Sequence, residues 1–500
     1  MTAAQFHEIV ADRWHLVAVV GAVLLITTYF PSLMALIRLY SIPLAGKDLG
    51  SHEKRRTAYL TGARKIYGEG YRKFKDGIFR ITTSRKSPVI VVSPKFLAEL
   101  KKLPDDIVSM TAAVDETMEV KYTRIDTYVP IIPHTIKAQL TPSLVRLNNV
   151  LHQEVQEAMS LELPATDEWK EVDLHKALLR IIGMVSGRVF IGPELCRSEE
   201  YLDAAINYTM DVMAAQRAVQ SMRPWLRPLM APRLPQVKKL DQRIAEAEAF
   251  MRPVVEARRK MAADPSVENP DDMLQWLMDN QSKFLDSRSQ NLAKAQLGLG
   301  FAAIHTTTLT ATNAFYDLAA LPDIVPELRE EAQAALDANG GVFTSTALQS
   351  MGKMDSLLKE TLRVSPASMA SFQRKVMKPF TLSNGQTIPA GVTIEVPAVA
   401  VNSDCDVFPD ADRFDPLRFY NLRQQAREKK SVEAAAQNQF VSVSQDSLTF
   451  GYGRHACPGR FFAANEIKMI VACALMKYDF KNVDGCSTRY PNIEFAHMVS

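Results

Sequence analysis

Apolar residues recur at intervals of three and four along most of the chain, the spacing that gathers side chains on one face of an α-helix. The longest such stretch runs from about Gln290 to Leu321 and meets no proline until Pro322, so that helix must cross most of the molecule. Shorter helices are predicted over residues 95–103, 144–161, 174–190, 201–219, 237–261, 273–279, 326–338, 346–363 and 458–478.

Strand signals are few. Two β-branched runs, at residues 78–83 and 89–93, are separated by a polar turn and predict neighbouring strands, and residues 380–397 combine strand and turn signals. Residues 404–422 and 424–444 are expected to be irregular. Without an internal repeat or a convincing linker in this part of the chain, the pattern favours one domain, mainly α with small β-sheets.

The amino terminus differs in composition from the rest. Residues 16–37 lack Asp, Glu, Lys and Arg, and as a helix they would extend about 33 Å, enough for a bilayer core of about 30 Å. A cleaved signal peptide is the alternative, but its apolar region would be shorter. We therefore predict a lumenal segment over residues 1–15, a transmembrane anchor over 16–37, a hinge or linker over 38–60 and the main folded domain over 61–500.

Basic residues dominate the stretch after the predicted anchor, which by the positive-inside rule keeps the body of the protein in the cytosol. They are Arg38, Lys47, Lys54, Arg55, Arg56, Arg64 and Lys65, against Asp48 and Glu53. The net charge of the whole chain is only +3, without a basic stripe of the kind that nucleic acid requires, so nucleic acid is not an expected partner. Five scattered cysteines argue against a disulfide framework.

The most informative segment is the ten-residue loop 450–459, Phe-Gly-Tyr-Gly-Arg-His-Ala-Cys-Pro-Gly. Its glycines permit a tight turn, and Pro458 suits the first turn of a following helix. Cys457 would then lie at a helix amino terminus, where the thiolate that binds metals is favoured. Phe450 could cover the sulfur, and Arg454 suits a carboxylate such as a haem propionate.

Two other readings of this loop remain. His455 beside Cys457 suggests zinc, but a structural zinc site needs about four ligands and no second pair with suitable spacing lies nearby. A cysteine nucleophile with a histidine base is also compatible with the residues, although it leaves the flanking glycines and the arginine unexplained.

The loop resembles the haem-binding signature of the cytochrome P-450 family, matched at Phe450, Gly453, Arg454, Cys457 and Gly459. The resemblance implies the cytochrome P-450 fold and heme b with Cys457 as the axial thiolate ligand of the iron. Two further motifs stand in the family's order. Glu360-Thr-Leu-Arg363 resembles the family's acid–arginine pair, and the segment 416–419 resembles the one that adds a second arginine, here Arg418.

The long predicted helix carries a further match at residues 302–307, Ala-Ala-Ile-His-Thr-Thr. Thr306 resembles the family's oxygen-activating hydroxyl, and the alanines Ala302 and Ala303 would leave room over the iron. His305 stands where the family has an acid. It either relays protons or is an interior histidine whose hydrogen bonds are satisfied within the fold.

The resemblance also suggests contacts to the haem propionates. Arg374 follows the Glu360 helix where the family has a propionate arginine, and His134 and Lys137 stand where the family has a tryptophan and an arginine. Surface ion pairs are the alternative role for all three residues.

Closer similarity, in the segments 69–76, 301–306 and 460–466, is to fungal enzymes of secondary metabolism that resemble ent-kaurene oxidase. It implies a monooxygenase that hydroxylates or otherwise oxidises a lipophilic terpenoid, meroterpenoid or polyketide with O2. Electrons would come from NADPH through NADPH–cytochrome P-450 reductase, with cytochrome b5 as a second donor, at the endoplasmic reticulum membrane. The alternatives are a haem-thiolate isomerase that needs no reductase and a haem-binding sensor without turnover.

Overall fold

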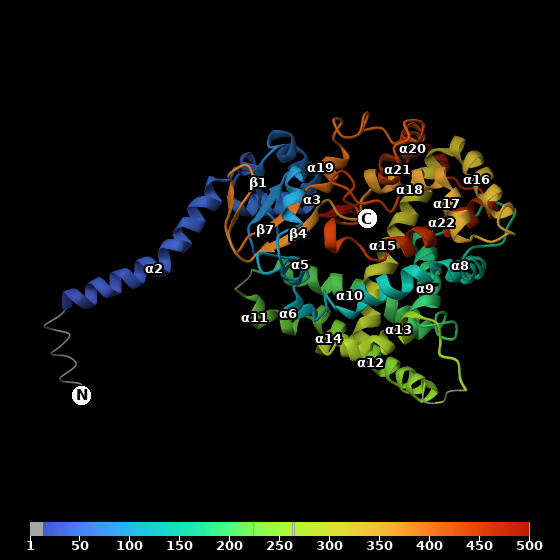
Figure 1. Ribbon diagram of the computed structural model, residues 1–500, viewed down its shortest axis with the longest axis horizontal. Coiled ribbons are helices and arrows are strands. Elements are labelled where there is room, and N and C mark those ends of the chain that lie inside the picture. Colours follow the sequence, from blue (N-terminus) through green and yellow to red (C-terminus); the bar gives the residue numbers. More distant parts are fainter. Residues whose placement is uncertain (1–13, 224, 263, 265, 500) are drawn as a thin grey trace.

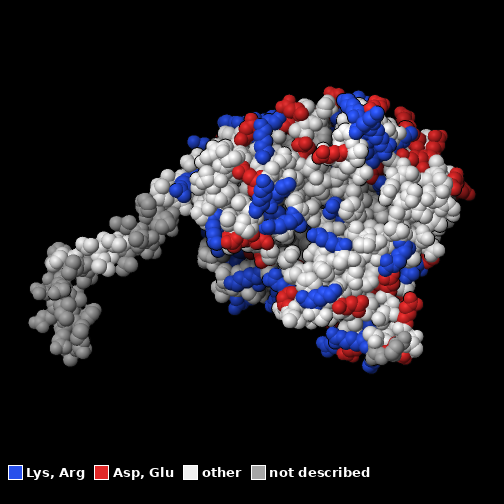
Figure 2. All heavy atoms as spheres, viewed as in Figure 1, with Lys and Arg blue, Asp and Glu red and all other residues white. Residues whose placement is uncertain are grey.

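The structure is a computed structural model that describes residues 14–223, 225–262, 264 and 266–499. It is mainly helical with three small β-sheets, as the sequence predicts. Figure 1 shows the largest sheet on the side of the molecule where the first helix leaves, and the helices on the other side. Figure 2 shows basic and acidic side chains interspersed over the face in view.

The largest sheet has five strands in the order β1-β2-β7-β4-β3. β2 is antiparallel to β1 and parallel to β7, and β4 is antiparallel to β7 and β3. The two strands predicted first are confirmed as β1 and β2. The strands of the three sheets are β1 (Ile78–Ile81), β2 (Val89–Val92), β3 (Val108–Ser109), β4 (Ser371–Val376), β5 (Phe380–Thr381), β6 (Thr387–Ile388), β7 (Thr393–Val396), β8 (Glu494–Phe495) and β9 (Met498–Val499).

Most predicted helices are confirmed within a few residues, and α9 coincides with its predicted range. Polar caps fix several ends: Asp173 accepts from the Lys176 amide at the start of α9, and Asn291 accepts from the Lys294 amide at the start of α15. The helices of the first half are α2 (Trp14–Ser41), α3 (His52–Lys73), α4 (Leu97–Leu100), α5 (Met110–Thr117), α6 (Val120–Thr123), α7 (Ile131–Thr135), α8 (Thr141–Glu162), α9 (Leu174–Phe190), α10 (Glu199–Ser221), α11 (Arg227–Met230) and α12 (Pro235–Ala262).

Three differences appear in the second half. The helix expected over 346–363 is two helices, because Met351 between them leaves helical geometry. Residues 404–422 and 424–444, which were expected to be irregular, contain the helices α20 and α21. The final helix starts at residue 460, two residues later than predicted. The helices are α13 (Met273–Asn280), α14 (Ser287–Gln290), α15 (Leu292–Ala320), α16 (Val325–Asp337), α17 (Ser345–Ser350), α18 (Gly352–Val364), α19 (Ala398–Asn402), α20 (Arg418–Glu428), α21 (Val432–Gln437) and α22 (Arg460–Lys477).

The amino-terminal helix α2 covers the stretch expected as a membrane anchor and extends away from the body (Figure 1). Among the described residues, no helix combines the length and the apolar character that a membrane crossing requires. Helix α3 begins inside the expected linker 38–60, and its Tyr59 is fully buried, so part of that linker belongs to the folded body. Most of the expected lumenal segment 1–15 lies outside the described residues.

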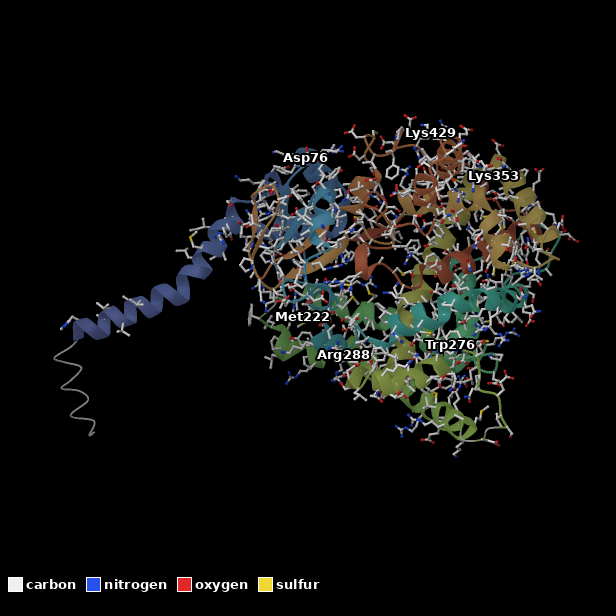
Figure 3. All side chains as sticks on the ribbon, viewed as in Figure 1. Asp76, Met222, Trp276, Arg288, Lys353 and Lys429 are labelled. Carbon is white, nitrogen blue, oxygen red and sulfur yellow. The ribbon has the colours of Figure 1, made fainter. Side chains whose placement is uncertain are left out.

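Helix α15 is the spine of the fold, as its length predicts. It packs against α9, α10, α12, α18 and α22, and most of its buried apolar residues belong to one large buried cluster. Helices α18 and α20 pack together on another side, which Lys353 and Lys429 mark in Figure 3. This arrangement brings α15 and α22, which follows the Cys457 loop, into direct contact.

The predicted pairing of Glu360 with two arginines is confirmed. Glu360 on α18 is fully buried and accepts hydrogen bonds from Arg363 and, at 3.1 Å, from Nε of Arg418. Arg363 also donates to the carbonyl oxygens of Asn402 and Ala411, both at 2.7 Å. The network therefore holds the irregular segment before α20 against α18.

Candidate functional site

The Cys457 loop is a closed backbone turn. The amide of Cys457 donates to the carbonyl oxygen of Phe450 at 2.8 Å, and a 3₁₀ turn covers Gly453–His455 inside the loop. Gly451 and Gly453 have φ values of 77° and 70°, the left-handed region that favours glycine. A Cβ on Gly453 would also lie 3.2 Å from Cβ of Lys101. The loop therefore needs both glycines to present the sulfur as it does.

The sulfur of Cys457 lies where opposing effects act on its pKa. Burial raises the pKa of the Cys457 thiol above its usual value, whereas the amides of Gly459 and Arg460 and the charge of Arg460 lower it. Helix α22 begins at Arg460 with Gly459 as its N-cap, so Pro458 precedes the first turn rather than occupying it. The predicted influence of the helix amino terminus is thus present, but burial outweighs it.

Phe450 and Arg454 flank the loop in different surroundings. Phe450 is half-buried and meets Phe440 edge to face, with ring centroids 5.6 Å apart. Arg454 points to the surface: its side chain is 45% exposed and donates to Asp105 at 2.6 Å and to the carbonyl oxygen of Leu103 at 3.0 Å. In this arrangement Arg454 holds the loop to the segment after α4.

Arg374 is a buried cation, and His455 lies near it. Arg374 is only 5% exposed, yet within the described part of the chain it forms no ion pair; it donates to the Gln373 carbonyl oxygen and lies 4.2 Å over the Phe372 ring. Burial, followed by the charge of Arg454, lowers the pKa of Arg374 to about 10. Burial and then the Arg374 charge lower the pKa of His455. Both residues line a small cleft beside Tyr452, and Arg454 lines the same cleft.

The sequence predicted a haem propionate contact for Arg454 and none for His455. No signal in the sequence separates these two adjacent basic residues. In the structure Arg454 and His455 both line the cleft of Arg374, and Nε of Arg454 donates to Nε2 of His455 at 3.1 Å.

One face of α15 is accessible in the middle of an otherwise buried helix. Ala302 and Thr306, one turn apart, are exposed, whereas Ile304, Thr307 and Thr308 are buried. The Thr306 hydroxyl donates to the Ala302 carbonyl oxygen at 2.8 Å. Because neighbouring helices pack around α15, this exposed strip indicates an open space beside the helix.

His305 points away from that strip toward α10. Its Nε2–H donates to the carbonyl oxygen of Ile206 at 2.8 Å, and burial lowers the pKa of His305. This bond fixes the tautomer and links α15 to α10. The contact favours the interpretation of His305 as an interior histidine with satisfied hydrogen bonds.

His134 and Lys137 are both exposed. The His134 ring lies 5.2 Å from the ring of Phe284, in the segment after α13. Neither side chain lines the cleft of Arg374 and His455. Within the residues that the structure describes, no group of three or more His, Cys, Asp or Glu side chains could hold a metal ion, and a structural zinc site needs about four ligands.

Comparisons with known proteins show the family to which the chain belongs. The family profile described as Cytochrome P450 matches residues 134–496. The cytochrome P450 monooxygenase ATR3 of Stachybotrys chlorohalonatus is 43% identical over 414 residues, which cover 83% of this chain and 86% of the relative. The cytochrome P450 monooxygenase AN1598 of Emericella nidulans is 34% identical over 493 residues, covering 96% and 90%. The corresponding enzyme TES1 of Alternaria alternata is 33% identical over 486 residues, covering 97% and 90%.

Proposed function

We propose a cofactor geometry, a substrate class, a redox partner and a membrane location for this chain, which belongs to the cytochrome P450 family and is a cytochrome P450 monooxygenase. The observation that carries the proposal is the closed Cys457 loop directly before α22, since α22 packs against α15, the helix that carries the accessible residues Ala302 and Thr306.

The residues of the site fit a haem, the cofactor that the family implies. Cys457 would be the axial thiolate ligand. Arg374 would hold a propionate with Arg454 and His455 of the same cleft, because a buried guanidinium without a carboxylate partner is costly until an anion neutralises it. Phe450, Gly453 and Gly459 would shape the loop around the sulfur. The bound haem supplies the oxygen activation that a thiolate ligand favours.

Thr306 is the residue that we expect to handle protons. Its hydroxyl is anchored on the Ala302 carbonyl oxygen, lies on the accessible face, and can also accept a hydrogen bond from a water molecule. The Nε2–H of His305 is already committed to Ile206. We therefore assign His305 to positioning α15 against α10.

The substrate that we propose is a lipophilic secondary metabolite, a terpenoid, meroterpenoid or polyketide, that is hydroxylated or otherwise oxidised. Small residues at Ala302 and Ala303 leave space for an apolar skeleton, and no charged side chain lies on that strip of α15. The relatives named above are all fungal monooxygenases, which supports a fungal metabolite.

Electron supply and location complete the proposal. Electrons would come from NADPH through NADPH–cytochrome P-450 reductase, with cytochrome b5 as a second donor, because the sequence contains no evident nicotinamide or flavin motif. The uncharged stretch 16–37 supports a single anchor in the endoplasmic reticulum membrane, with the enzyme domain in the cytosol.

The test is turnover by the haem-loaded, full-length chain with and without reductase and NADPH. Terpenoid and polyketide extracts from a strain that lacks the gene would serve as substrate, and products would be identified by mass spectrometry. Oxygenated products that require both reductase and NADPH are expected. Products formed without reductase would show a rearrangement enzyme instead, and haem binding without any product would show a sensor.

A further inference from the structure

We propose that the protein has a second small-molecule site, for a neutral ring-containing lipophile, in a cavity distant from Cys457. The cavity lies between the segment after α8, the ends of α15 and α22, and the segment after α22. Its volume is about 590 Å³. This is within the range of about 300 to 1,000 Å³ that is usual for small-molecule sites.

The floor of this cavity is apolar and buried. Four apolar side chains, each at most 3% exposed, line it: Ile181 of α9, Phe315 of α15, and Ile470 and Ala474 of α22. Water would find few hydrogen-bond partners on such a floor, so displacing it with an apolar ligand is favourable.

Aromatic rings form the walls. The Phe480 ring lies 5.2 Å from Phe315, and the Tyr490 ring meets Tyr316 edge to face at 5.3 Å. Trp169 stands at the mouth with 60% of its surface exposed. Rings arranged around a space of this size offer faces and edges to another ring, which selects planar or polycyclic ligands.

The charged side chains that line the cavity include both acidic and basic residues, so they do not favour a charged ligand of one sign. Lys481 already covers the Trp169 face at 4.2 Å. Tyr316 offers a polar contact: burial and then the Asp173 carboxylate raise its pKa, so the phenol stays protonated and can donate to a carbonyl or hydroxyl oxygen. The charged lining residues are Asp167, Glu168, Glu171, Asp173 and Asp479, with Lys170, Lys477 and Lys481.

The cavity is separate from the oxygenation site but shares two helices with it. Tyr316 is ten residues beyond Thr306 on α15, about 15 Å along the helix axis. No residue of the Cys457 loop lines the cavity. A ligand here would contact the far ends of the helix that carries Thr306 and of the helix that follows Cys457, as an effector would. The inference thus goes beyond the proposed oxygenation.

The test measures binding of N-phenyl-1-naphthylamine, a neutral fluorescent lipophile, to the haem-loaded full chain. Two adjacent alanines provide a variant and its matched control. Ala319 lines the cavity, whereas Ala320 next to it does not. Ala319→Trp should fill the space and weaken probe binding about tenfold or more, a loss of about 1.4 kcal/mol. Ala320→Trp should leave binding unchanged.

A third variant separates this cavity from the substrate site. Ala302→Trp fills the accessible face of α15 and should retain probe binding, with hydrogen-exchange protection at the end of α22 and over residues 478–490. The proposal is overturned if wild type shows no saturable binding, or if Ala319→Trp binds the probe like wild type. Loss of the signal in Ala302→Trp would equally overturn it, since the probe would then occupy the substrate site.

Discussion

Glu360 accepts hydrogen bonds from Nε and Nη2 of Arg363, at 2.8 and 2.7 Å, while the two side chains are 0% and 4% exposed. Spacing of three residues on a helix occurs in many surface ion pairs. This pair differs because Arg363 also donates to the carbonyl oxygens of Asn402 and Ala411, far along the chain. In addition, Arg418 forms a second ion pair with Glu360. The pair therefore stabilises the tertiary packing of that segment against α18, and not only α18 itself.

Replacing Glu360 by Ala should lower the free energy of unfolding by about 3 to 5 kcal/mol, since it leaves two buried guanidinium groups without their carboxylate. Denaturant titration followed by far-UV circular dichroism measures the change. Glu53→Ala is the matched control: Glu53 pairs with Arg56 at the same spacing, but its side chain is 69% exposed. A Glu360→Ala midpoint equal to that of this control would contradict a structural role for the pair.

Hydrophobic periodicity predicted the helices that bury one face, such as α9, and missed those held by polar contacts. The sequence of α20 has few apolar positions, and the helix is stabilised by α18: Ser356 Oγ accepts from the Phe419 and Tyr420 amides, both at 3.0 Å, and Arg423 donates to Asp355 at 3.0 Å. Such contacts join residues more than sixty positions apart. A local pattern does not contain them.

For the candidate site, the sequence predicted the position of the loop but not the directions of its side chains. Glycine spacing and the cysteine located the loop, because its backbone needs φ values that other residues rarely adopt. The direction of each side chain was not predictable. Arg454 turns outward to Asp105, and His305 turns to Ile206, since the partners come from other elements of the fold.

Haem retention should depend more on Arg374 than on Arg454. Arg374→Ala removes the buried cation that we expect to face a propionate, so haem transfer to apomyoglobin should become about tenfold faster or more, as expected for a lost buried ion pair. Arg454→Ala removes a half-exposed cation of the same cleft that already pairs with Asp105, so it should change the rate less. Equal rates for both variants, or a larger effect of Arg454→Ala, would refute the assignment of the propionate to Arg374.

Thr306→Ala should uncouple electron transfer from oxygenation. The variant should release more hydrogen peroxide per NADPH consumed in the presence of reductase, while its haem content stays at the wild-type level. Thr308→Ala is the control, because Thr308 is fully buried and its hydroxyl donates to the Ile304 carbonyl oxygen at 2.8 Å. If both variants couple like wild type, the Thr306 hydroxyl has no part in proton handling.

Glu466 on α22 should make stability depend on pH. Its carboxyl is fully buried and accepts from Ser186 Oγ at 2.8 Å, and burial raises the pKa of Glu466 from 4.5 to about 8. Because the folded protein holds the proton more tightly than the unfolded chain, this contribution to stability is complete below about 4.5 and is lost as the pH rises toward 8.

The neutral variant Glu466→Gln should therefore gain stability relative to wild type as the pH rises through this interval. Denaturant titrations of both proteins across the range measure the difference. A difference that stays constant with pH would show that Glu466 is ionised in the folded protein.

The central claim is that Cys457 is the thiolate ligand of a haem, and the carbon monoxide difference spectrum of reduced protein tests it most directly. Wild-type protein reconstituted with haem should give the long-wavelength Soret band that is characteristic of thiolate ligation. Cys457→Ala should lack this band, and Cys473→Ala, which removes a buried cysteine at the centre of α22, should keep it. A band that persists in Cys457→Ala would contradict the account.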